Sequence, residues 1–235
     1  MSIAKARPRV HKHALRTLAQ RILTGEVAQG QTLLPESELC ETLGIGRSSL
    51  REVMKVLVGK GLISSRPRAG TVVLSRDQWN ILDPDLLNWS MELPPDPHFV
   101  MSLIEARQAI EPASARLAAM RASAADLAPV EAAYASMCIN LKEKDFVAFN
   151  VADIDFHTAL LRASKNVVFV QMSKTIGTAL GYAFRMTIAR SREPGGSLAM
   201  HGEVIAAILA RDPALAQEAM TRLLNIAILD LGLSG

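Results

Sequence analysis

The chain has 235 residues, of which 49% are hydrophobic and only 4% aromatic, and it carries a net charge of +3. It contains only two cysteines and no apolar run of about 18 residues, which argues against a disulfide framework and a membrane span. No apolar signal-peptide segment follows the basic N-terminus, so we expect a mainly α-helical, cytoplasmic protein without a membrane partner.

The charge is unevenly distributed along the chain. Residues 1–78 contain 13 Lys and Arg against 6 Asp and Glu, whereas residues 79–235 contain 13 against 17. A basic N-terminal part followed by an acidic part is typical of a nucleic-acid-binding domain joined to a second module. The alternative is that these charged residues only form solvated surfaces and bind no partner.

Two short helical patterns follow an N-terminal helix that we expect near His13–Thr24. The first covers residues 36–43 after Pro35, with glutamates in its first turn, and a glycine ends it. The second covers residues 47–59 and begins with a small, polar and cationic turn. The recognition helix of a helix-turn-helix needs this character, because its N-terminal end meets phosphates and base edges in the major groove.

A basic hairpin is predicted next, with strands at residues 62–65 and 71–74. Its tip contains Arg66, Arg68 and Gly70, and arginines at such a tip can reach the narrow minor groove. The sequence therefore predicts a winged helix-turn-helix at residues 8–75.

This order of motifs resembles the DNA-binding head of GntR-family transcription regulators. The resemblance implies that Arg47, Ser48, Ser49 and Arg51 make the main DNA contacts, with Gly46 admitting the backbone. The wing residues Arg66, Arg68 and Gly70 are expected to add further DNA contacts. One position departs from the family, because Ser37 or Glu38 stands where its second helix has an arginine. That departure puts one phosphate or base contact in doubt. The competing interpretation is that the arginines only make the helix soluble.

A segment of different composition, residues 76–97, combines proline and aspartate with both tryptophans of the chain. A short helical pattern, Asp85–Met91, lies inside it. A flexible tether would not expose Trp79 and Trp89, so we expect a docked connector that packs one domain on the other.

Residues 98–233 are almost entirely amphipathic helix, which predicts an all-α bundle of six to seven helices. The expected spans are His98–Arg121, Ala124–Lys142, Lys144–Ala163, Val167–Arg192, Leu198–Ala210 and Pro213–Leu231.

Two stretches of this bundle, residues 107–119 and 150–166, resemble the ligand-sensing FCD domain in the FadR branch of the GntR family. The resemblance thus covers essentially the whole chain. Residues 77–89 of the connector and the pattern Glu105-x-Arg107-x-x-x-Glu111-Pro112 add a likeness to repressors of sugar-acid operons.

Asp153 and His157 are four residues apart in one expected helix, so both project from the same face. A carboxylate and an imidazole one turn apart can bind a divalent cation, although such a pair alone is more often a surface ion pair. His201, after the next break, is the natural third ligand, and the family pattern has ligands at all three positions. That pattern also has a fourth ligand, a histidine, where this chain has Leu223.

We therefore expect a divalent metal ion, zinc or nickel, on Asp153, His157 and His201, with open positions for the carboxylate and 2-hydroxyl of a sugar acid. The alternative is a metal-free site whose three side chains bind ligand hydroxyls directly.

Arg107 lies on an otherwise apolar part of its helix, where an inward guanidinium needs an anion. It is either a clamp for the effector carboxylate, which the resemblance favours, or the partner of Glu111 one turn on. Ser197 is expected to offer its hydroxyl to the ligand.

The predicted function is a homodimeric transcription regulator that binds a palindromic double-stranded DNA operator. We favour a repressor released by a sugar acid such as galactonate, a related aldonate or a 2-keto-3-deoxy acid, with activation as the alternative. Two rivals stay open: a regulator of the same family that senses a small hydroxy acid or an acyl-CoA, and a metal-dependent enzyme. The enzyme hypothesis lacks an evident nucleophile or general base beside the three ligands.

Overall fold

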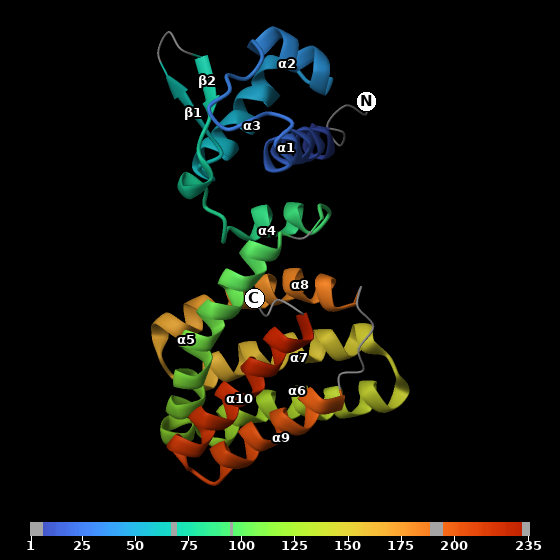
Figure 1. Ribbon diagram of the computed structural model, residues 1–235. Coiled ribbons are helices and arrows are strands. Elements are labelled where there is room, and N and C mark those ends of the chain that lie inside the picture. Colours follow the sequence, from blue (N-terminus) through green and yellow to red (C-terminus); the bar gives the residue numbers. More distant parts are fainter. Residues whose placement is uncertain (1–6, 67–69, 95, 189–194, 232–235) are drawn as a thin grey trace, which may run out of the picture. The chain divides into compact units, whose positions relative to one another are not determined.

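The computed structural model describes residues 7–66, 70–94, 96–188 and 195–231. They form two compact units, Met1–Pro94 and Pro95–Gly235 (Figure 1). The first unit combines helices with one small sheet, and the described part of the second is entirely helical. This confirms the expected fold class, a winged helix-turn-helix followed by an all-α bundle.

The first unit contains α1 (Arg7–Leu23), α2 (Glu36–Leu43), α3 (Arg47–Gly59), β1 (Ile63–Arg66), β2 (Gly70–Val73), the 3-10 helix η1 (Arg76–Gln78) and α4 (Pro84–Ser90). The turn between α2 and α3 is short because Gly44 takes the left-handed conformation, φ 63°, and ends α2. The strands β1 and β2 pair antiparallel, and Thr32 adds a bridge to Val72. The first unit therefore carries the predicted helix-turn-helix and wing.

The core of the first unit lies between α1, α3 and the sheet. Its fully buried side chains include Leu18, Ile22, Leu50, Leu57 and Leu62. The apolar positions of α3 face this core, which leaves its cationic first turn on the surface.

The connector packs on the first unit. The indole Nε1 of Trp79 donates to the carbonyl of Leu74 over 2.9 Å. The ammonium of Lys60 contacts Asp83 at 2.6 Å and Asp85 at 2.7 Å. The helix inside the connector, α4, begins at Pro84 rather than one residue later, because the Asp83 side chain caps it.

The second unit contains α5 (Pro97–Arg121), α6 (Ala124–Glu143), α7 (Phe146–Ala163), α8 (Val167–Ile188), α9 (Gly195–Leu209) and α10 (Pro213–Leu231). The expected start of α7 at Lys144 was wrong. Lys144 has φ 59° and ends α6, while Asp145 caps α7 by accepting from the backbone N–H of Ala148. The expected start of α9 at Leu198 was also late, because its helix already includes Gly195.

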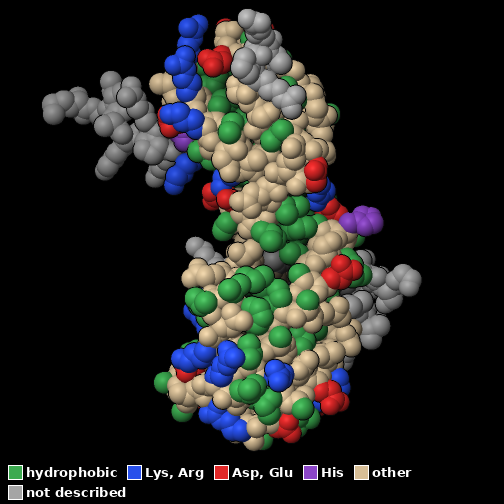
Figure 2. All heavy atoms as spheres, turned by 90° about the vertical axis from the view of Figure 1, so that its left-hand side faces the viewer, with side chains coloured by type: hydrophobic (Ala, Val, Ile, Leu, Met, Phe, Trp, Pro, Cys, Tyr) green, Lys and Arg blue, Asp and Glu red, His purple; other side chains and the backbone are tan. Residues whose placement is uncertain are grey.

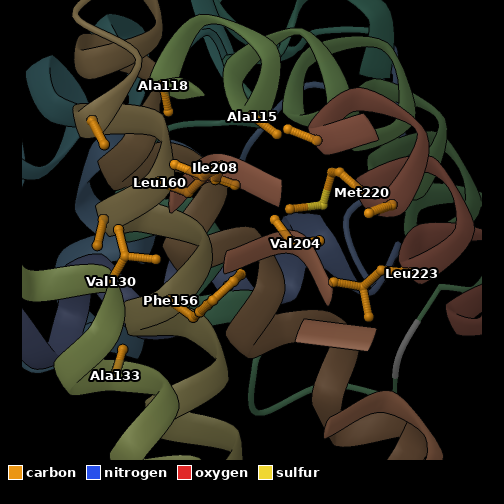
Figure 3. Packing of buried hydrophobic residues seen from close by; sticks show 14 of the residues in the cluster. Ala115, Ala118, Val130, Ala133, Phe156, Leu160, Val204, Ile208, Met220 and Leu223 are labelled. Carbon is orange, nitrogen blue, oxygen red and sulfur yellow. The ribbon is translucent and has the colours of Figure 1, made fainter. Parts of the chain in front are cut away.

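The core of the second unit is built from α5, α6, α7, α9 and α10 (Figure 3). Phe156 and Leu160 of α7 meet Val204 and Ile208 of α9 in this cluster. Alanines such as Ala118 let the helices approach closely. This packing brings polar residues of α5, α7 and α9 to one buried place.

Candidate functional site

The first turn of α3 is the exposed cationic surface that the sequence predicted. Its N-cap is Gly46, which has an extended backbone and no side chain to bond the first-turn amides. Arg47, Ser48 and Arg51 are exposed, and Ser49 is half-buried. Lys and Arg side chains line an edge of the first unit in Figure 2. Free amides at a helix N-terminus beside arginines suit a phosphate backbone.

The two predicted wing residues that the structure describes flank the wing tip. Arg66 is the last residue of β1, and Gly70 is the first residue of β2. Gly70 has φ 79°, and a Cβ there would lie 3.0 Å from the Thr32 side chain, so the position requires glycine. Arg68 lies outside the described residues.

The departure on α2 lies on the surface. Ser37 and Glu38 are both exposed, as are the neighbouring Glu36 and Glu41. This helix therefore presents carboxylates where the family presents an arginine, and a DNA phosphate close to it would be repelled.

The predicted metal ligands are buried together in the second unit. Asp153 and His157 lie on α7 and His201 on α9, and each is at most 6% exposed. His201 Nε2 lies 3.0 Å from Asp153 Oδ1 and 3.4 Å from His157 Nε2. His157 Nε2 lies 3.7 Å from Asp153 Oδ2. The helical spacing and the packing of α9 on α7 thus bring the three side chains to one point.

The outer nitrogens of both imidazoles meet oxygen acceptors. His201 Nδ1 lies 2.7 Å from the backbone oxygen of Ser197, one turn earlier in α9. His157 Nδ1 lies 2.6 Å from Oε2 of Glu111 on α5. The carbonyl of Ser197 can only accept, so His201 Nδ1 is the donor toward it, whereas His157 Nδ1 and Glu111 form a close ion-pair contact. The Nε2 atoms of both rings face Asp153 and each other.

The two carboxylates of the site are ionised. Burial alone would raise the pKa of Glu111, but Arg107 and His157 outweigh it and lower the pKa to about 2. Burial opposes ionisation of Asp153 as well, and the neighbouring His157 and His201 nevertheless hold its pKa below the usual range. Both groups are therefore hydrogen-bond acceptors near neutral pH.

The arrangement fits a divalent cation. The ligand atoms of Asp153, His157 and His201 all lie within 4.8 Å of one another. Two ligand atoms of a tetrahedral ion with bonds of about 2.0–2.2 Å lie about 3.3–3.6 Å apart, close to the separations found here. The three groups are of the kinds that bind such an ion in proteins, an imidazole nitrogen twice and a carboxylate oxygen once. The donor set of two imidazoles and one carboxylate suits zinc or nickel.

The guanidinium of Arg107 is paired with Glu111. Its Nε donates to Oε1 over 2.6 Å, and its Nη2 lies 3.5 Å from Oε2. Among the described residues, Glu111 is the acceptor that this guanidinium contacts. The pair engages one edge of the guanidinium, so it is compatible with a further anion on the other edge.

An aromatic ring packs against both imidazoles. The ring of Phe156 meets His201 and His157 edge to face, with centroids 4.7 and 5.5 Å apart. Leu223, at the position of the family's fourth ligand, is buried in the core with Phe156 (Figure 3). Asn225 lies near Leu223 in sequence, but it accepts from Gln108 over 2.8 Å at an exposed position. A metal ion here would thus have three protein ligands.

Two features of the site were not predicted. Glu111 was considered only as a partner of Arg107, whereas its second oxygen contacts His157. Ser197 was expected to act through its hydroxyl, and its backbone oxygen contacts His201 in addition. The first contact joins two helices, and the second depends on a backbone group that every residue carries, so spacing alone did not reveal either.

Comparison with known proteins gives the same two-part division. Residues 11–73 match the description "Bacterial regulatory proteins, gntR family", and residues 102–225 match the FCD domain. The galactonate operon transcriptional repressor of Escherichia coli K12 is 39% identical over 171 residues, which cover 73% of this chain and 74% of that protein. The chain belongs to the GntR family.

This GntR regulator is also similar to two further proteins. The putative L-lactate dehydrogenase operon regulatory protein of Escherichia coli K12 is 36% identical over 146 residues, 60% of this chain and 54% of that protein. The structure of Lar from Listeria monocytogenes shares the fold, with a TM-score of 0.66, 18% identity and coverage of 100% of both chains.

The GntR regulator is thus a DNA-binding transcription regulator with a C-terminal FCD effector domain, and it is not an enzyme. The matched family models and the relatives are of transcription regulators, which argues against the rival hypothesis of a metal-dependent enzyme. None of the described helices combines the length and apolarity that crossing a bilayer requires.

Proposed function

We propose that this regulator is a homodimeric repressor of a sugar-acid operon, released from a palindromic operator when a sugar acid binds its FCD domain together with a divalent metal ion. The convergence of three buried acceptor groups, on Asp153, His157 and His201, carries this proposal. The 39% identity to the galactonate operon repressor supports an aldonate such as galactonate, or a related 2-keto-3-deoxy acid, as the effector.

Asp153, His157 and His201 would hold the ion, with zinc or nickel as the best match to the donors. When bound, the ion supplies a Lewis acid that attracts the carboxylate and 2-hydroxyl oxygens of the acid. Arg107 would bind the same carboxylate from α5, and Ser197 would add its hydroxyl from α9.

The buried charges favour an anionic effector. With neutral imidazoles, Asp153 and Glu111 contribute two negative charges, and Arg107 contributes one positive charge. A bound divalent cation changes the net charge of the site from negative to positive. The carboxylate of one effector molecule then neutralises that positive charge. The metal ion therefore increases affinity for the acid, and the acid increases affinity for the metal ion.

On DNA, the first turn of α3 would enter the major groove through Gly46, Arg47, Ser48, Ser49 and Arg51. The wing, with Arg66, Arg68 and Gly70, would reach the adjacent minor groove. A two-fold pair of heads reads two half-sites, which accounts for a palindromic operator. Release follows from linkage, because an effector that prefers one conformation of the dimer weakens operator binding by the same factor.

A thermal-melt panel tests the proposal. The protein is melted with aldonates, uronates, 2-keto-3-deoxy acids, small hydroxy acids and acyl-CoA esters, each with added Zn²⁺ and with EDTA. We expect one sugar acid to raise the melting temperature in proportion to the logarithm of its concentration, and EDTA to abolish the rise. The same acid should release promoter DNA in a gel shift.

Each other result of the melt panel leads to a different conclusion. A rise that survives EDTA would contradict the metal but keep the acid. A response to lactate or another small hydroxy acid would move the effector to the class named by the lactate operon relative. A response to acyl-CoA esters alone would overturn the sugar-acid proposal, because the buried site is lined by charged groups that a lipid chain cannot bind.

A further inference from the structure

Among the residues of the second unit whose burial the structure describes, Glu111 is the most deeply buried charged group, with 0% of its surface exposed. Its two oxygens together contact both Arg107 and His157. Oε1 accepts from Arg107 Nε over 2.6 Å, and Oε2 lies 2.6 Å from His157 Nδ1. One carboxylate from α5 thus holds both the proposed anion-binding guanidinium and a proposed metal ligand.

We propose that Glu111 is a positioning residue that fixes His157 as a metal ligand and keeps the charge of Arg107 from opposing the metal. This inference rests on the metal site of the proposed function. Glu111 itself contacts neither the metal nor the effector; it acts through the two residues beside it.

The first part of the argument concerns the orientation of His157. A carboxylate on Nδ1 fixes the tautomer with Nε2 unprotonated, orients the ring and makes Nε2 a stronger donor to a metal ion. His201 has a neutral backbone oxygen in the same place, at 2.7 Å. The two imidazoles are therefore not equivalent, and removing the charge of Glu111 weakens His157 while leaving His201 oriented.

The second part concerns the charge of Arg107. Its guanidinium is buried and is separated from His157 by the Glu111 carboxylate alone, because Nε lies 2.6 Å from Oε1 and His157 Nδ1 lies 2.6 Å from Oε2. A fixed positive charge one carboxylate away from a metal ligand repels the metal cation unless a negative group accompanies it. Glu111 is that group, so loss of Glu111 both loosens His157 and exposes the metal to the guanidinium.

The two substitutions should therefore affect metal affinity differently. Glu111→Gln removes the charge without changing size and should weaken metal binding by about 10- to 100-fold, the usual effect of losing such a partner. Arg107→Met leaves Glu111 on His157 and removes a repelling charge, so metal affinity should stay equal or rise. A pair that is merely structural would weaken metal binding in both variants.

The experiment measures the affinity for Zn²⁺ alone by competition with a chromophoric chelator, and the absorption spectrum of the Co²⁺-loaded protein. Glu105→Gln is the matched control, because Glu105 lies on the same helix with an exposed side chain. It should bind Zn²⁺ as the unaltered protein does. Glu111→Gln should show weaker Zn²⁺ binding and an altered Co²⁺ spectrum.

The double variant Arg107→Met/Glu111→Gln keeps the inference testable if Glu111→Gln alone does not fold, because it removes both buried charges together. It should bind Zn²⁺ more weakly than Arg107→Met does. Equal affinity in these two variants, or in Glu111→Gln and the unaltered protein, would overturn the inference while leaving the metal site intact. No Zn²⁺ binding by the unaltered protein would overturn the metal site itself, and this inference with it.

Discussion

Lys60, the residue that ends the recognition helix α3, is paired with Asp83, the residue that caps the connector helix α4. Their charged atoms lie 2.6 Å apart, and only 10% of the lysine side chain is exposed. Burial disfavours the charged lysine, yet Asp83 and Asp85 raise its pKa above the usual value. Trp89 of α4 adds its ring 5.4 Å from the same ammonium. The connector is therefore an integral part of the DNA-binding unit.

Lys60→Met should detach the connector from the first unit. The substitution leaves Asp83 without its cation, and we expect a loss of about 2 kcal/mol in the free energy of unfolding of that unit. Both tryptophans lie in the connector, so fluorescence during urea unfolding reports it directly. Lys55→Met is the control: its pair with Glu52 is exposed, so it should cost below about 0.5 kcal/mol. Equal losses would contradict this account.

Gly61→Ala should destabilise the same junction through the backbone. Gly61 has φ 73°, and a Cβ there would lie 2.4 Å from the backbone oxygen of Gln78. We expect a loss of at least about 2 kcal/mol, measured by urea unfolding. Gly59→Ala is the matched control, because a Cβ at Gly59 meets no atom within 4 Å and alanine favours the helix. A stable Gly61→Ala variant would mean that the connector does not approach Gly61 in solution.

The first unit was predictable from sequence because its signals are local. A glycine at the end of α2 and a small, cationic turn at the start of α3 mark the turn between them wherever they occur. The spacing of Asp153 and His157 is local in the same sense. His201 lies on another helix, so its spacing could not connect it to them. It was assigned to the site by its place after the Pro194-Gly195-Gly196 break and by the family resemblance.

The features that escaped prediction depend on tertiary packing. The contact between Glu111 and His157 exists because α5 packs on α7, and the sequence displayed only the partner of Glu111 one turn away. The start of α7 was misplaced for a local reason instead, because Lys144 takes a left-handed conformation that lysine rarely adopts. The pairing of Lys60 with Asp83 was not predicted either. Composition indicated that residues 76–97 form a connector, but it did not indicate which residue the connector contacts.

Arg47→Ala tests the proposed orientation of the recognition helix. Arg47 is exposed in the first turn of α3, so the substitution should spare the fold and weaken operator binding about 10- to 100-fold. Fluorescence anisotropy with the protein's own promoter DNA measures this affinity. Arg121→Ala, at an exposed position of α5 in the second unit, is the charge-matched control. Unchanged affinity of the Arg47 variant would rule out this orientation.

The metal-free second unit should lose stability in acid. Folding lowers the pKa of Glu111 from 4.5 to about 2, so the unfolded chain takes up its proton first as the pH falls. The stabilisation is present above about pH 4.5 and is lost as the pH approaches 2, an effect of up to about 3 kcal/mol. Denaturant unfolding in EDTA at several pH values measures it. Glu111→Gln should flatten this dependence, and an unchanged dependence would assign it to other carboxyl groups.

Arg107→Met should separate DNA binding from release. Arg107 is buried in the second unit and lies outside the helix-turn-helix, so operator affinity without effector should match that of the unaltered protein. The variant lacks the cation proposed to bind the effector carboxylate, so release should need about 10- to 100-fold more acid, the effect of losing a hydrogen bond to a charged group. Titration of a gel shift with galactonate or the acid found in the melt panel measures this. Gln108→Met, beside Arg107 but bonded to the exposed Asn225, is the control and should release normally. Normal release in the Arg107 variant would reduce Arg107 to the structural partner of Glu111.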